Sequence, residues 1–218
     1  MMSNAQDDVT AQANAALEAV YTASTPDELA KAYAAWAASY DSETAALGYY
    51  LPFQITAWVA RYVPAGEGPL LDAGCGTGLS GPALNALGYN DLAGLDLSDD
   101  MLKIAGSRGA YSDLRRAALG EALPWPDGHF RAFFSTGVFT ISHAPASGLF
   151  ELVRITRKGG HAIFTVRDQV LESGGFPDVF AALEQQGKWR PVEEGPWFRA
   201  YAIADPDAMV KTFVYEII

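Results

Sequence analysis

Apolar residues recur at helical spacing through the first third of the chain. Thr25, Pro26 and Glu28 form a capping box with proline at the first helical position, which marks the start of a helix. The apolar repeat that follows predicts one continuous helix. Its apolar positions are Leu29, Tyr33, Trp36, Ala37 and Tyr40. Two further helices are predicted over residues 8–21 and 55–62, so the first third is expected to be helical.

From Gly68 onward the pattern changes to short apolar runs that alternate with amphipathic segments and glycine turns. Uninterrupted apolar runs of this length are typical of buried strands. Strands are predicted over residues 69–73, 92–97, 132–136 and 162–166, with a weaker one over 115–119 and a last one over 212–218. Helices are predicted over residues 79–87, 98–105, 147–156 and 177–186, and Gly88 and Gly159 are placed to end two of them.

Alternating strands and helices indicate right-handed βαβ units and a parallel sheet. The fold class predicted is α/β: a Rossmann-like, doubly wound, mostly parallel sheet with an antiparallel C-terminal edge strand and a helical N-terminal extension. Residues 1–218 are expected to form a single domain. Within it, residues 1–66 make the extension, which serves as a lid, and residues 67–218 make the α/β core.

Composition and charge limit the classes of partner and site that the chain is expected to have. The 218 residues carry a net charge of −11, which disfavours nucleic acid and anionic membranes as partners. Cys75 is the single cysteine, which rules out an intramolecular disulfide, and we predict no metal site. Residues 1–12 are polar and acidic, and the chain has no apolar run long enough to span a bilayer. A cytoplasmic protein is therefore expected.

Three glycines at alternate positions follow the first predicted strand. Gly74, Gly76 and Gly78 lie between an apolar strand that contains Asp72 and the next helix. Glycine allows positive φ and close approach of the backbone to a ligand, and a helix N-terminus presents free N–H groups with positive partial charge. This turn suits a ligand that carries a carboxylate. The alternative is a tight turn with only a structural role.

The same segment matches the dinucleotide fingerprint G-x-G-x-x-G from Gly76 to Gly81. Asp96 ends the second predicted strand about 20 residues later, where a carboxylate accepts hydrogen bonds from both ribose hydroxyls of an adenosine. An NAD-dependent oxidoreductase needs the same acid. The structural alternative is that Asp96 complements the dipole of the following helix, but Asp99 and Asp100 already do this.

From Tyr33 to Arg167 the chain resembles class I S-adenosylmethionine-dependent methyltransferases. The resemblance rests on four segments in the family's order: the glycine segment with Asp72, residues 96–102, residues 123–130, and residues 151–160. Residues 137–145 further resemble the Williams-Beuren syndrome region methyltransferase-like group. An NAD-dependent oxidoreductase accounts for only the first two segments. A non-catalytic S-adenosylmethionine-binding regulator is a further alternative.

The resemblance implies a set of cofactor-binding residues. The methionine end of S-adenosylmethionine, and of the product S-adenosylhomocysteine, is expected beside Gly74, Cys75, Gly76, Gly78 and Asp72, with Ser135, Thr136 and Gly137 facing the methyl group. The adenosine end is expected beside Asp96, Leu97, Met101, Ala118 and Leu119. Tyr40 is expected in the pocket. Cys75 is interpreted as a small filler in this loop rather than as a nucleophile.

Three positions depart from the family's pattern. Ala118 stands where many relatives have an acid that contacts the adenine amino group, so adenine recognition is expected to rest on the backbone and Leu119. Arg131 replaces the aspartate that usually begins the fourth strand, and Lys158 replaces a proline in the turn before the fifth. Both are expected to lie away from the cofactor.

The expected reaction moves a methyl group to a small-molecule acceptor by in-line displacement. The departing thioether is neutral, so positioning supplies most of the catalysis, and a base is needed only if the acceptor must lose a proton. His143 follows the fourth predicted strand by a few residues and is the candidate general base, because imidazole titrates near neutral pH. The alternative is a structural histidine that caps a helix or bonds a loop carbonyl.

Overall fold

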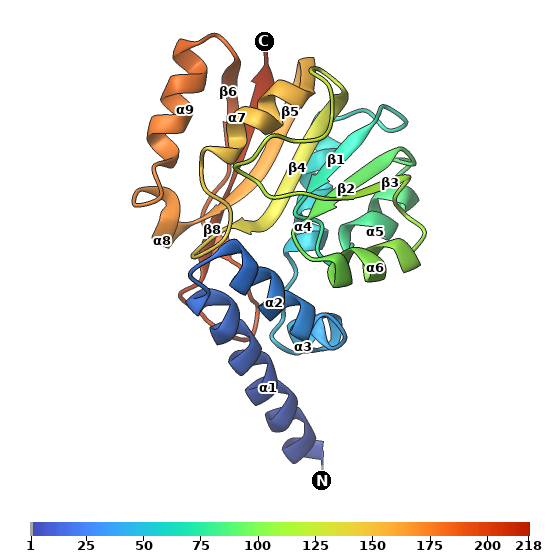
Figure 1. The fold of residues 1–218 in the computed structure, drawn as a ribbon, viewed down its shortest axis with the longest axis vertical. Helices are drawn as coiled ribbons and strands as arrows, with labels where there is room; N and C mark the ends of the chain where they lie inside the picture. The colour runs from blue at the N-terminus through green and yellow to red at the C-terminus, as the bar shows by residue number, and fades with distance from the viewer. Residues whose placement is uncertain (1) are drawn as a thin grey trace.

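The structure is a computed structural model that describes residues 2–218, with side chains described from residue 10 onward. Within residues 2–218, eight strands form one sheet in the order β3-β2-β1-β4-β5-β8-β6, with β7 paired to β8 (Figure 1). The strands are β1 (Leu70–Ala73), β2 (Leu92–Asp96), β3 (Asp113–Arg116), β4 (Phe130–Phe139), β5 (Thr156–Arg167), β6 (Trp189–Glu194), β7 (Phe198–Arg199) and β8 (Met209–Ile217). The first five run parallel and β8 runs antiparallel to β5. The predicted Rossmann-like α/β class is confirmed.

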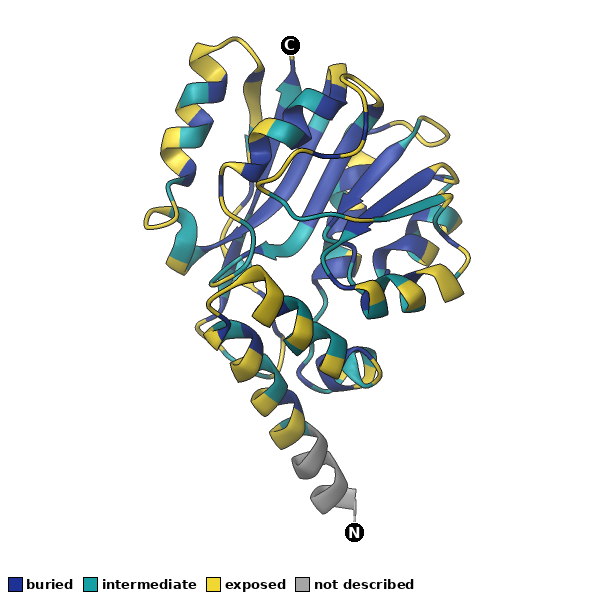
Figure 2. Ribbon diagram, viewed as in Figure 1, coloured by how far each residue is buried: buried dark blue, intermediate teal, exposed yellow. Residues whose placement is uncertain are grey.

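Helices cover both faces of the sheet. They are α1 (Met2–Thr22), α2 (Pro26–Trp36), α3 (Tyr40–Ala46), α4 (Leu51–Tyr62), α5 (Ser80–Ala86), α6 (Asp99–Ser107), α7 (Gly148–Ile155), α8 (Asp168–Leu171) and α9 (Phe176–Gln185). Alternate strand residues face opposite sides: Leu70 belongs to the core cluster that contains residues of α4 and α5, whereas Leu71 belongs to the one that contains residues of α7 and α9. Figure 2 shows the strands buried and the outer faces of the helices exposed.

The three N-terminal helices gather at one end of the sheet, as Figure 1 shows in blue. The predicted single helix through Tyr40 is wrong, because α2 ends at Trp36 and Tyr40 begins α3. The Ser39 hydroxyl donates to the Trp36 carbonyl, which competes with the helical hydrogen bonds. The buried Trp36 indole N–H donates to Glu43 (2.8 Å), which holds α3 against α2. The chain therefore turns where the local pattern predicts continuation.

The sheet has more strands beyond its last predicted strand than the sequence predicts. The last strand is antiparallel as expected, but β6 and β7, which have no clear sequence pattern, pair with its outer side. Gly159 does not end α7, which stops at Ile155. It lies in β5 with φ +76°, where the register against β4 shifts. None of the helices in the described part of the chain is long and apolar enough to cross a membrane.

Phe164 is the centre of the aromatic core and gives a test of it. Its ring is fully buried and contacts the rings of Phe133, Phe139, Phe180, Trp189, Phe213 and Tyr215. Phe164→Ala is expected to lower the free energy of unfolding by about 3–5 kcal/mol, because it leaves a cavity. Denaturant unfolding measures the change, and the control Val192→Ala, at an exposed site, should change stability by less than about 0.5 kcal/mol. A loss below about 1 kcal/mol for Phe164→Ala would contradict this packing.

Candidate active site

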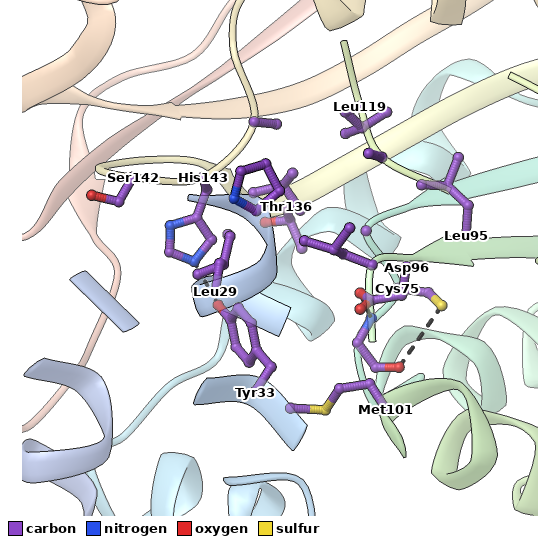
Figure 3. Close-up of a pocket in the computed structure, with 18 of the residues that line it drawn as sticks. Leu29, Tyr33, Cys75, Leu95, Asp96, Met101, Leu119, Thr136, Ser142 and His143 are labelled. Carbon is purple, nitrogen blue, oxygen red and sulfur yellow. Dashed lines mark hydrogen bonds between the residues drawn. The ribbon is translucent and has the colours of Figure 1, made fainter. Parts of the chain in front are cut away.

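A cavity of about 490 Å³ lies between the N-terminal helices and the carboxyl ends of β1, β2 and β4. Figure 3 shows Leu29, Tyr33 and His143 on one side of this space and Asp96, Cys75 and Met101 on the other. Ligands of open α/β sheets bind at the carboxyl ends of strands, and small-molecule sites have volumes of roughly 300–1,000 Å³. The cavity has the position and size of a small-molecule site.

The glycine turn after β1 forms one wall. Gly74 and Gly76 both have positive φ, +81° and +54°, and both line the cavity. A Cβ at Gly74 would overlap Val138, whereas one at Gly76 would meet nothing within 4 Å. Gly78 also has positive φ, but it does not line the cavity. A Cβ there would lie 2.8 Å from the Tyr111 ring, so this glycine makes room for packing behind the turn.

Asp96 ends β2 and holds the turn in place. Its Oδ2 accepts a hydrogen bond from Gly76 N (2.9 Å) and its Oδ1 accepts one from Ser98 N (2.9 Å). Burial raises the pKa of Asp96, and the backbone hydrogen bonds oppose that shift. Each carboxylate oxygen has a second lone pair. Asp96 can therefore accept one further hydrogen bond per oxygen from the cavity, which matches two neighbouring hydroxyl groups.

Asp72 lies deeper, at the end of β1, and is only 2% exposed. Its Oδ2 accepts a hydrogen bond from the Tyr111 hydroxyl (2.7 Å). Burial raises the pKa of Asp72 to about 7, and the Tyr111 hydrogen bond lowers it in part. The Tyr111 ring packs where Cβ atoms at Gly78, Gly81 and Gly94 would stand. Tyr111 does not line the cavity but supports Asp72 from behind the turn, a role that the sequence pattern does not reveal because its partners are distant in the chain.

The N-terminal helices supply the opposite wall. Tyr33, Tyr40 and Tyr49 line the cavity, and Asp41 of α3 ties this wall to the glycine turn. Asp41 Oδ1 accepts the Thr77 hydroxyl (2.6 Å), and Asp41 Oδ2 pairs with Arg108. Tyr33 and Tyr40 are signalled by their helical repeat, whereas Tyr49 follows α3 in an isolated β-bridge to Tyr201 and has no such signal. These contacts close the cavity on the side away from the sheet.

His143 faces the cavity from the loop after β4. Its Nε2 lies 2.6 Å from the Tyr33 hydroxyl and its Nδ1 lies 2.5 Å from the Ile141 carbonyl. Burial lowers the pKa of His143, which keeps the ring neutral at neutral pH. Cys75 also lines the cavity, and burial raises the pKa of its thiol, so it is not activated as a nucleophile.

Most residues predicted for the site line the cavity. They are Tyr40, Asp72, Gly74, Cys75, Gly76, Asp96, Leu97, Met101, Ala118, Leu119, Thr136, Gly137 and His143. Gly78 and Ser135 do not. Ser135 is fully buried and donates to the Ala73 carbonyl (2.7 Å), because it directly follows Phe134, the last residue of β4 that pairs with β1. Thr136 and Gly137 lie beyond that pairing and reach the cavity. Arg131 and Lys158 are outside it, and the described residues contain no cluster suited to a metal ion.

Comparison with known proteins gives the class. The family described as "Methyltransferase domain" matches residues 71–164. Human methyltransferase-like protein 27 is 32% identical over 173 residues, which are 75% of this chain and 69% of that protein. The TehB-like S-adenosylmethionine-dependent methyltransferase from Corynebacterium glutamicum has the same fold, with a TM-score of 0.63, 18% identity, and coverage of 85% of this chain and 98% of that chain.

The chain belongs to the class I S-adenosylmethionine-dependent methyltransferase superfamily. This replaces the NAD-dependent oxidoreductase alternative, while the narrower resemblance to one subgroup stays a prediction. Relatives differ in the acceptor that their names give. The malonyl-[acyl-carrier protein] O-methyltransferase of Erwinia pyrifoliae is 37% identical over 56% of this chain and 45% of its own length. An 18S rRNA (guanine(1575)-N(7))-methyltransferase of Saccharomyces cerevisiae is 41% identical over 30% of this chain and 24% of its own.

The buried carboxyl of Asp72 predicts a pH-dependent stability. Its folded pKa of about 7 lies above the ordinary value of 3.8, so its contribution to stability is fully present below about pH 4 and is lost as pH rises through 7. Asp72→Asn keeps an acceptor for Tyr111 and removes this loss. Between pH 5 and pH 8, the unfolding free energy of the variant relative to the wild type should rise by about 2.5 kcal/mol. Denaturant unfolding at both pH values is the test, and an equal difference at both would contradict the pKa shift.

Proposed function

We propose that the protein moves a methyl group from S-adenosylmethionine to a small molecule that carries no negative charge. The charge of the cavity lining carries the proposal. Among the described residues that line it, Asp72 and Asp96 are the acidic groups, and no lysine or arginine is present. An enclosed site with acids and no basic side chain favours a cationic donor and disfavours phosphate or carboxylate groups. Its walls of tyrosine and apolar residues suit a small organic acceptor.

The residues present fit the cofactor. Asp96 has a free acceptor position on each oxygen for the two ribose hydroxyls, and Leu97, Met101, Ala118 and Leu119 give an apolar slot of the kind that adenine occupies. Asp72 offers a carboxyl for the ammonium group at the methionine end, beside the glycine turn. When bound, S-adenosylmethionine supplies an activated methyl group whose leaving group is a neutral thioether. The protein then has to orient the acceptor and exclude water.

The acceptor lies, in this proposal, beside Tyr33, Tyr40 and Tyr49. Holding two reactants in line can supply about 7–11 kcal/mol of rate enhancement without acid or base. A ribosomal RNA acceptor, as one relative is named for, would bring many phosphates to a chain with a net charge of −11. A small uncharged or cationic acceptor meets no such repulsion.

Replacement of Asp96 tests the cofactor site. Asp96→Ala removes charge-assisted hydrogen bonds to the ribose, so S-adenosylhomocysteine should bind about 30-fold more weakly, or about 2 kcal/mol. Calorimetric titration measures this, with NAD expected not to bind. Asp99→Ala, at an exposed acid in α6, is the control and should bind as the wild type does. Wild-type affinity in a folded Asp96→Ala variant, as judged by circular dichroism, would place the ribose elsewhere.

The charge of the acceptor is tested with three probes of similar size. Phenol, benzylamine and benzoate are added to the protein loaded with S-adenosylhomocysteine, and saturation-transfer NMR reports which of them contact it. Phenol and benzylamine should bind at least 10-fold more tightly than benzoate, since the lining offers an anion no positive partner. Preferential binding of benzoate would overturn the assignment of an acceptor without negative charge.

A further inference from the structure

The hydrogen bonds of His143 define its tautomer. A backbone carbonyl oxygen can only accept, so the 2.5 Å contact from Nδ1 to the Ile141 carbonyl requires the hydrogen on Nδ1. In a neutral ring, Nε2 then carries a lone pair. The Tyr33 hydroxyl, 2.6 Å away, must donate its hydrogen to that lone pair. The two ring nitrogens are therefore both occupied, and His143 has none free to meet an acceptor directly.

The Tyr33 oxygen is the atom of this pair that can still accept a hydrogen bond. After donating its hydrogen to His143, the phenol oxygen still has lone pairs, and Tyr33 lines the cavity beside the strand ends. Figure 3 shows the Tyr33 ring reaching His143 from α2 across the edge of the space. The two residues are 110 positions apart in the chain and come from the N-terminal helices and the α/β core. Docking of α2 against the core therefore creates the pair.

The backbone beside His143 is held in a costly conformation. Ser142 has φ +61°, in the left-handed region that residues other than glycine rarely adopt. Its hydroxyl donates to the Tyr21 carbonyl of α1 (2.9 Å), which fixes the loop to the N-terminal helices. Such strain costs on the order of 1–3 kcal/mol and persists only where the surrounding contacts enforce it. The loop is thus fixed in the conformation that directs His143 at Tyr33.

We propose that Tyr33 is the catalytic residue that takes the proton of the acceptor and passes its own hydrogen to Nε2 of His143. This rests on the proposed function, because it assumes an acceptor in this cavity. As the acceptor oxygen or nitrogen bonds to the methyl carbon, the carbon–sulfur bond breaks with its electron pair going to the neutral thioether, and the acceptor's O–H or N–H proton moves to Tyr33 Oη. The Tyr33 hydrogen moves to His143 Nε2, which gives an imidazolium still bonded to Ile141. Once the product has left, the proton returns from His143 through Tyr33 to water in the cavity. The acceptor class is a molecule with an O–H or N–H group.

The surroundings favour a concerted transfer. Tyr33 faces Tyr40 and Asp96, and burial, followed by these groups, raises its pKa, so a free tyrosinate does not form on its own. His143 faces Tyr21 of α1, Tyr33 of α2 and Arg167 of β5. Burial is the main cause of its lowered pKa, and Arg167 adds to it. The neutral imidazole is therefore ready to receive a proton at neutral pH, and the transfer should fail as pH falls below the His143 pKa.

The tautomer is tested by NMR of protein labelled with nitrogen-15 in histidine and loaded with S-adenosylhomocysteine, with His143→Gln to assign the signal. The expected result is a neutral His143 with hydrogen on Nδ1. Tyr33→Phe should raise the pKa of His143, because it frees the Nε2 lone pair, whereas Tyr50→Phe should not. Tyr50 lies outside the cavity and donates to the Arg199 carbonyl. Hydrogen on Nε2, or no response to Tyr33→Phe, would overturn the relay.

The proton transfer is tested by S-adenosylhomocysteine formation from S-adenosylmethionine with phenol as the probe acceptor, between pH 5 and 8. The wild-type rate should rise with pH and level off above the measured His143 pKa. Tyr33→Phe should lower the rate by about 10²-fold and remove this midpoint, with Tyr50→Phe unchanged. Equal rates in the wild type and Tyr33→Phe would contradict the relay. The affinity of the same samples for S-adenosylhomocysteine distinguishes a failure of the relay from a failure of the proposed cofactor site. If Tyr33→Phe binds S-adenosylhomocysteine as the wild type does, the cofactor site is intact and the rates test the relay alone.

Discussion

A buried carboxyl, that of Asp72, and a partly buried one, that of Asp96, lie at the carboxyl ends of β1 and β2, and a carboxyl removed from water is tolerated only when it is hydrogen bonded. Asp96 meets this constraint with the N–H groups of Gly76 and Ser98, which fixes the glycine turn against the end of β2. Asp72 meets it with the Tyr111 hydroxyl, whose ring needs the space left by glycines. The shape of the cavity wall therefore follows from the hydrogen bonds that these two carboxyl groups accept.

The second half of the site comes from the N-terminal helices. Asp41 bonds Thr77 of the glycine turn and pairs with Arg108, and Tyr33 bonds His143 of the loop after β4. The ion pair is partly exposed and adds little stability on its own, so its main effect is on geometry. A segment distant in sequence from the glycine turn is in this way held over it. The same contacts that shape the cavity also bring Tyr33 and His143 together.

Sequence reasoning succeeds here where the signal is local. The apolar runs, the glycine turn and Asp96 before the α6 cap can each be found within a few residues of chain, and their places in the fold are confirmed. It fails where long-range packing decides. The end of α2 at Trp36 depends on a bond to Glu43 across a turn, and the role of Gly78 depends on the ring of Tyr111. The pairing of β6 with the last strand likewise has no pattern in its own residues.

His143 shows the same difference between what local sequence predicts and what long-range packing decides. Its place near the strand ends follows from its position after the fourth strand, but its partners do not, because Tyr33 lies 110 residues earlier. Only the folded chain shows that Nε2 is already occupied. The distinction matters for the proposed chemistry, in which the acceptor contacts the phenol oxygen of Tyr33 instead of an imidazole nitrogen. The base predicted from residue type stays a prediction, and the geometry adds Tyr33 as its hydrogen-bonded partner.

The central claim is that the cavity between the N-terminal helices and the strand ends takes up the cofactor. Amide hydrogen–deuterium exchange with and without S-adenosylhomocysteine tests it most directly. The account predicts slower exchange in the glycine turn after β1, in the segment from Asp96 into α6, and in α2, with β6 and α9 unchanged. Slower exchange confined to β6 or α9, with no change at the glycine turn, would contradict it.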